Sequence, residues 1–136
     1  MKPVFVDTSA FIAMGNKRDQ FHRQAIELRN QFIKSKRAHI TTSAVLMELG
    51  NAFSPTQLRS TAIRLIDTIK ISRFWQVIPI NDDLFDRGFA KFKQMADKEW
   101  SLIDCISIVI AEEFRIIEIF TNDHHFEQAG FKILMK

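Results

Sequence analysis

Four acidic residues have sequence surroundings that are typical of a reactive site. Two of them, Asp7 and Asp123, follow the short apolar runs Val4–Val6 and Ile116–Phe120. Both runs are typical of buried β-strands. In open parallel sheets, ligands bind outside the carboxyl ends of the strands. We therefore expect Asp7 and Asp123 to lie at a binding edge.

The other two acids lie among aliphatic residues, Glu48 within the segment 44–49 and Asp104 within the segment 102–106. A charge in such surroundings has to be exposed, paired or bound to a metal, because burying it bare is very costly. If all four carboxylates converge at one sheet edge, their mutual repulsion requires a hard divalent cation. Ligation by oxygen alone favours Mg²⁺ or Mn²⁺ over zinc.

Each acid also has a purely local explanation, and these alternatives stay open at the level of the sequence. Asp7 and Asp123 are residue types that cap helices well. Ser101 and Asp104 have the spacing of a capping box. Glu48 would face solvent if its helix were amphipathic.

The histidines and the single cysteine predict no additional site. His124 and His125 stand directly after Asp123, but two adjacent histidines lack the spacing of a zinc site. Cys105 lies in an apolar run, so we expect a buried, reduced thiol.

The hydrophobic pattern predicts the elements that position these acids. Short strands that alternate with helices predict an α/β domain with a mostly parallel sheet and helices on both faces. In the helix at 82–95 we expect Leu84, Phe85, Phe89 and Phe92 to face inward. The expected strands are 3–6, 38–41, 75–80, 116–120 and 131–134, and the expected helices are 10–14, 19–34, 43–53, 55–69, 82–95, 101–114 and a short turn of helix within 122–128.

Length and composition fit one compact domain over residues 1–136, with 46% hydrophobic residues and 13 phenylalanines for its core. We recognise no signal peptide and no membrane span, so we expect a cytoplasmic protein. The net charge of +3 is compatible with a polyanionic partner. The candidates for contacts with the phosphates of such a partner are Arg37, Arg59, Arg64 and Arg73, for which solvated helix faces are the alternative explanation.

Four segments carry a resemblance to a known family over essentially the whole chain. They are Val4–Ser9, the helix position Glu48, Ser101–Cys105 and Thr121–Phe126, in this order and spacing. The combination resembles the PIN-domain nucleases, and particularly the VapC-type toxins.

The resemblance implies a three-layer α/β/α domain whose acidic pocket binds Mg²⁺ or Mn²⁺ and cleaves RNA. The residues that match the family's four acids are Asp7, Glu48, Asp104 and Asp123. The residues that match its supporting hydroxyl groups are Ser9 and Thr121. The segments 10–47 and 55–98 contain no motif that we can match.

In the chemistry that this implies, Asp7, Asp104 and Asp123 hold the metal, while Glu48 either binds it through water or positions the attacking water. The resemblance further implies a toxin role, a homodimer and neutralisation by a cognate antitoxin protein. The alternative is a catalytically silent PIN-like module that binds RNA or protein.

Three other classes of phosphate- or metal-binding domain each lack a required residue. An aspartyl-phosphate phosphatase needs a second aspartate where this chain has Ser9. A phospho-receiver domain needs a lysine where it has Asp123. A metal-dependent adhesion site needs a serine where it has Phe11.

Overall fold

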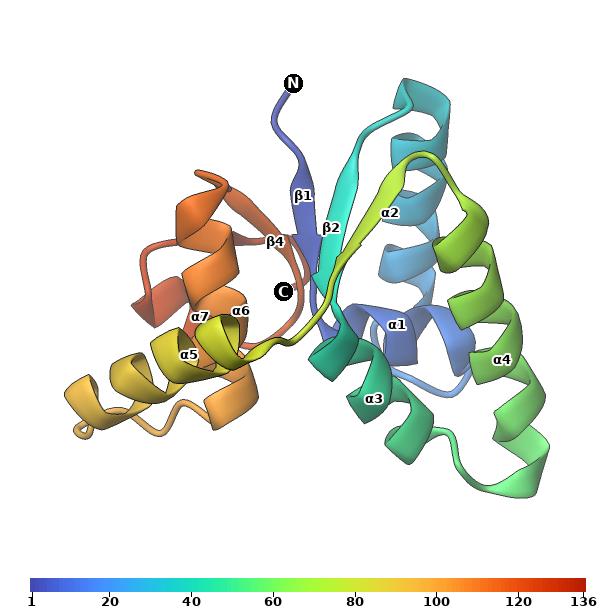
Figure 1. Ribbon diagram of the computed structural model, residues 1–136. Coiled ribbons are helices and arrows are strands. Elements are labelled where there is room, and N and C mark those ends of the chain that lie inside the picture. The colour runs from blue at the N-terminus through green and yellow to red at the C-terminus, as the bar shows by residue number, and fades with distance from the viewer.

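The computed structural model describes residues 1–136 and shows a five-stranded sheet in the order β3-β2-β1-β4-β5 (Figure 1). The elements in chain order are β1 (Val4–Val6), α1 (Thr8–Gly15), α2 (His22–Ser35), β2 (His39–Thr42), α3 (Ser43–Ala52), α4 (Thr56–Ile71), β3 (Trp75–Ile78), α5 (Asp82–Gln94), α6 (Leu102–Glu113), β4 (Glu118–Phe120), α7 (His125–Gln128) and β5 (Lys132–Ile133).

Every strand pairing in the sheet is parallel. The central strand β1 pairs with β2 through Phe5 and Ile40, and with β4 through Val6 and Phe120. All three residues of β1 are fully buried. The expectation of a mostly parallel sheet is therefore confirmed in a stronger form, since no antiparallel strand is present.

The helices form two groups on either side of the sheet, which gives the expected three layers. Figure 1 shows α1, α2 and α4 beside one face, and α5, α6 and α7 beside the other. One continuous core joins the layers and includes Phe5, Phe11, Phe120 and Phe126, all essentially inaccessible to solvent. The core is thus rich in phenylalanine, as the composition suggests.

Two helices begin at the capping residues that the sequence indicates. The Thr42 side chain accepts a hydrogen bond from the backbone N–H of Val45 and so caps α3. Asn81 caps α5 in the same way through the N–H of Leu84. No helix combines the length and the apolar character that crossing a bilayer requires.

One expectation about the core is wrong. On α5, Leu84 is 2% exposed, whereas Phe85, Phe89 and Phe92 are 44%, 42% and 42% exposed. The helix packs against α6 at Gly88, where the missing side chain allows close approach to Ile106, and Leu84 is buried on the same helix. The three phenylalanines lie beside this contact and form a partly exposed stripe, which we call the α5 stripe.

Replacing Gly88 by alanine tests this contact. The new Cβ would lie 2.3 Å from Cγ1 and 3.3 Å from Cα of Ile106 on α6, so the two helices would have to separate. Overpacking costs about 1–3 kcal/mol, which exceeds the gain of about 1 kcal/mol in helix propensity. We expect Gly88→Ala to lower the midpoint of thermal unfolding.

Gly50→Ala is the matched control, because nothing lies within 4 Å of the added Cβ on α3. This variant should gain about 0.5–1 kcal/mol from helix propensity alone. Equal and positive shifts for the two variants would contradict close packing of α5 on α6.

Candidate active site

The parallel sheet brings together the residues that follow its strands. Asp7 comes directly after β1 and precedes α1, and Asp123 lies just beyond β4. Since β1 and β4 are neighbours, both aspartates lie at the same carboxyl edge. Glu48 on α3 and Asp104 in the first turn of α6 face this edge, and both act electrostatically on Asp7. The structure thus gathers all four predicted acids.

Asp7 is the most buried of the four, with 6% of its surface exposed. Burial raises the pKa of its carboxyl to about 7, and the negative charges of Asp104 and Glu48 act in the same direction. The hydroxyl of Thr121 opposes this shift by donating a hydrogen bond of 2.9 Å to Oδ2 of Asp7. No lysine or arginine forms an ion pair with Asp7.

Ser9 and Thr121, the two predicted hydroxyl residues, touch each other. Their hydroxyl oxygens lie 2.9 Å apart. Because the hydroxyl of Thr121 donates its hydrogen to Asp7, the hydroxyl of Ser9 is the donor to Thr121. Thr121 also accepts from the backbone N–H of Asp123, and Ser9 from that of Asn122. These contacts fix the loop after β4 to the start of α1. The predicted supporting role of Ser9 and Thr121 would be exerted through these hydrogen bonds.

Thr8 is a residue of the site that the sequence analysis missed. Its hydroxyl donates a hydrogen bond to Oε1 of Glu48 on α3. This contact orients one oxygen of Glu48 and leaves the second carboxylate oxygen without a protein partner. Its position directly after Asp7 was the only sequence signal that could have pointed to Thr8.

Asp104 caps the start of α6 and also lies in the acidic site. Its side chain accepts from the N–H of Ser101 at 3.1 Å, while the Ser101 hydroxyl accepts from the N–H of Asp104 at 3.0 Å. The capping box suggested by the sequence is therefore present. The same carboxylate also faces Asp123 and His125.

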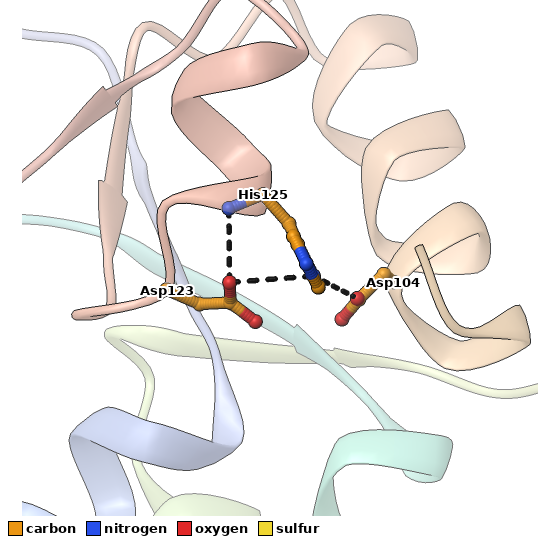
Figure 2. Close-up of side chains that lie close together, drawn as sticks. All are labelled: Asp104, Asp123 and His125. Atoms are coloured by element: carbon orange, nitrogen blue, oxygen red, sulfur yellow. Dashed lines mark hydrogen bonds and ion pairs between the residues drawn. The ribbon is translucent and has the colours of Figure 1, made fainter. Parts of the chain in front are cut away.

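His125 lies between two of the acids, as Figure 2 shows. Its Nδ1 is 3.2 Å from Oδ2 of Asp104 and 3.4 Å from Oδ1 of Asp123, and its backbone N–H donates to Asp123 at 2.9 Å. One donor atom from each of these three residues lies within 4.8 Å of the other two. His125 was not predicted as a site residue, because two adjacent histidines lack the spacing of a zinc site. The relevant partners come instead from other elements.

The donor set fits a divalent cation. Four carboxylates meet at one edge, and the only basic side chain within ion-pair distance of them is His125. Carboxylate oxygens are the ligands that Mg²⁺ and Mn²⁺ take. Asp104 and Asp123 have donor atoms close to each other, while Asp7 and Glu48 stand outside this group of three. Metal ligation by Asp7, Asp104 and Asp123 remains a prediction.

The predicted RNA-binding arginines lie apart from the acids. Arg37 and Arg73 precede β2 and β3, so they are at the amino edge of the sheet, and Arg37 is paired with Glu118 at 2.7 Å. Arg59 donates to the backbone oxygen of Ser54. Arg64 lines a groove beside α4. None of the four lies against an acidic site residue, and their phosphate contacts remain predictions.

Fold and site together define an α/β/α domain with an acidic site at the carboxyl edge of a parallel sheet. The sequence matches the family model described as PIN domain over residues 4–132. The chain therefore belongs to the PIN domain family, and the resemblance seen in the sequence is confirmed.

Two solved structures are similar to this chain over nearly its whole length. One is VapC20 of Mycobacterium tuberculosis, a sarcin-ricin loop cleaving toxin, with 24% identity, a TM-score of 0.83 and coverage of 98% of this chain and 99% of that one. Another is FitAcB from Neisseria gonorrhoeae, with 14% identity, a TM-score of 0.62 and 96% of each chain covered. At these identities the likeness shows the fold. No curated protein sequence matches the chain significantly.

The raised pKa of Asp7 predicts how stability depends on pH in metal-free protein. The folded state keeps a proton on Asp7 up to about pH 7, whereas the unfolded chain releases it near 3.8. Between these values the free energy of unfolding falls with rising pH, by at most about 1.4 kcal/mol per pH unit. Asp7→Asn removes this dependence.

We expect Asp7→Asn to raise the midpoint of thermal unfolding in EDTA, relative to the wild type, by more at pH 8 than at pH 4. Other titrating groups are common to both proteins and cancel in the difference. An equal difference at the two pH values would show that Asp7 ionises as freely in the folded protein as in the unfolded chain.

Proposed function

We propose that this protein is an endoribonuclease that hydrolyses RNA phosphodiester bonds with Mg²⁺ or Mn²⁺ and acts as the toxin of a toxin–antitoxin pair. The observation that carries the proposal is the gathering of Asp7, Glu48, Asp104 and Asp123 at one edge of a PIN-domain sheet. The fold likeness to the toxin VapC20 supports RNA as the substrate.

In this proposal Asp7, Asp104 and Asp123 hold the cation. When bound, the cation neutralises the scissile phosphate and makes a neighbouring water more acidic. Beside a bound cation Asp7 would be ionised, against the burial that otherwise favours its protonated form. Thr121 holds Asp7 in place through its hydroxyl, and Ser9 in turn holds Thr121.

Glu48 is the residue that we assign to the attacking water. Thr8 fixes one oxygen of its carboxylate, so the second oxygen is presented in a defined direction. A carboxylate held in this way can orient a water and accept its proton. Because Glu48 stands outside the close group of Asp104, Asp123 and His125, its role differs from that of those residues.

The test is RNA cleavage by the purified protein with Mg²⁺, Mn²⁺ or EDTA, beside the variants Asp7→Asn and Asp104→Asn. We expect cleavage with either metal and none in EDTA. Both variants should lose at least about 100-fold in rate, since even outer-shell changes at metal sites cost 10–100-fold. Asp67→Asn is the matched control, because Asp67 is exposed on α4 and has no ion pair.

Cleavage that survives both substitutions would place the active site elsewhere. Metal binding without cleavage of any RNA would favour the catalytically silent binding module. Equal losses in Asp67→Asn would mean that the substitutions act through stability rather than through the site.

This chain has a groove, away from the acids, that would suit the proposed antitoxin. A groove of about 680 Å³ lies between α2 and α4, and apolar residues such as Phe11, Leu65 and Trp75 line it. The charged residues that line it are all basic: Lys17, Arg29, Lys36, Arg37 and Arg64. An amphipathic segment with acidic flanks complements both properties, which supports an acidic antitoxin as the partner.

The proposed homodimer is supported by the α5 stripe. Phe85, Phe89 and Phe92 recur at helical spacing and are all partly exposed, and the rings of Phe85 and Phe89 lie 6.1 Å apart. Aromatic side chains are enriched in protein interfaces. We propose that a second copy of the chain covers this stripe.

Sedimentation velocity tests this assignment on the wild type, Phe89→Asp and Ile63→Asp. We expect a dimer for the wild type and for Ile63→Asp, which changes a somewhat more exposed apolar residue on α4. Phe89→Asp should be a folded monomer, because a charge at the centre of an apolar interface is desolvated without a partner. A dimeric Phe89→Asp protein would contradict the assignment.

A further inference from the structure

The ring nitrogen of His125 is placed as a ligand atom would be. Its distances to Asp104 and Asp123 are 3.2 and 3.4 Å, and the three residues come from α6, the loop after β4 and the start of α7. Ligands that bind one small divalent cation at about 2.0–2.1 Å lie roughly 3 Å from one another. The two distances from the ring nitrogen therefore have the spacing of neighbours around one ion, and all three donor atoms lie within 4.8 Å of one another.

The backbone holds His125 in this position. Its own N–H donates to Oδ1 of Asp123, and Asp123 is fixed in turn by the hydroxyl of Thr121 through its backbone N–H. Asp104 is fixed by the capping box with Ser101. The ring is only 22% exposed and the Asp104 side chain 13% exposed. The two carboxylates and the backbone of His125 are thus held by hydrogen bonds that do not depend on a cation, and the ring nitrogen itself contacts Asp104.

We propose that His125 is a metal ligand beside Asp104 and Asp123, and that its nitrogen makes the site prefer Mn²⁺ to Mg²⁺. The inference rests on the proposed function, because it concerns the cation of that same site. Imidazole suits transition-metal ions, whereas Mg²⁺ binds through oxygen. A site with one nitrogen beside its carboxylates therefore discriminates between cations that an all-oxygen site would treat alike.

The role of His125 differs from that of its neighbour His124. The centroids of the two rings lie 4.9 Å apart, and the ring planes are tilted by 55° to each other, so the two side chains are neighbours with different orientations. Only His125 has a nitrogen within reach of the carboxylates. His124 is therefore a matched control for the loss of a histidine at this position in the chain.

The test measures cation binding rather than cleavage. Binding of Mn²⁺ is followed by electron paramagnetic resonance, and Mg²⁺ by its competition with Mn²⁺, for the wild type, His125→Asn and His124→Asn. The asparagine amide offers an oxygen near the place of the ring nitrogen. We expect His125→Asn to lower the ratio of Mn²⁺ to Mg²⁺ affinity by about tenfold or more, and His124→Asn to leave it unchanged.

Pulsed electron paramagnetic resonance of the Mn²⁺-loaded wild type gives a second readout that needs no variant. We expect a ¹⁴N coupling from a directly bound imidazole, retained in His124→Asn and lost in His125→Asn. Mn²⁺ binding without this coupling, or an unchanged affinity ratio in folded His125→Asn, would overturn the inference and leave the proposed nuclease intact. Failure of the wild type to bind any divalent cation would overturn both.

Discussion

The burial of Asp7 at the end of β1 is the constraint on which the acidic site depends. The strand is inaccessible to solvent on both faces, so the carboxylate that follows it has little water around it. Glu48 and Asp104 add negative charge nearby, and the single hydroxyl of Thr121 compensates only in part. Protonation or a bound cation therefore stabilises Asp7 in this place.

The parallel direction of all five strands separates two surfaces of opposite charge. Residues that follow strands meet at the carboxyl edge, where the acids lie. Residues that precede strands, such as Arg37 and Arg73, lie at the amino edge. The groove with basic lining borders that second edge through His39 and Trp75, the first residues of β2 and β3. The excess of basic residues in the composition thus says nothing about the charge at the acids.

Much of the fold followed from local patterns. The strand before Asp7 and the caps at Thr42, Asn81 and Ser101 depend on neighbouring residues alone, so the sequence was enough to predict them. The facing of α5 was not predictable in this way. The spacing of its apolar residues predicts a helix but does not say which side of the helix packs on α6. The close approach at Gly88 determines that side.

The site shows the same division between local and tertiary information. The convergence of Asp7 and Asp123 follows from the rule for parallel sheets. The contact of Thr8 with Glu48 joins residues 40 positions apart, and that of Asp104 with His125 joins residues 21 apart. Neither pair has a spacing that a single helix or strand would produce. Only the packing of α7 beside the start of α6 makes the histidine a neighbour of the acids.

The length of β2 determines how far the groove lies from the acids. The strand runs from His39, which lines the groove, to Thr42, which caps the helix that carries Glu48. Three steps along a strand span about 10 Å. Because β2 is buried along its whole length, a chain bound in the groove would have to pass around the strand to reach the carboxyl edge, so this length is the shortest possible span. About three or four extended residues are therefore the lower limit for a peptide that connects an anchor in the groove with the acids.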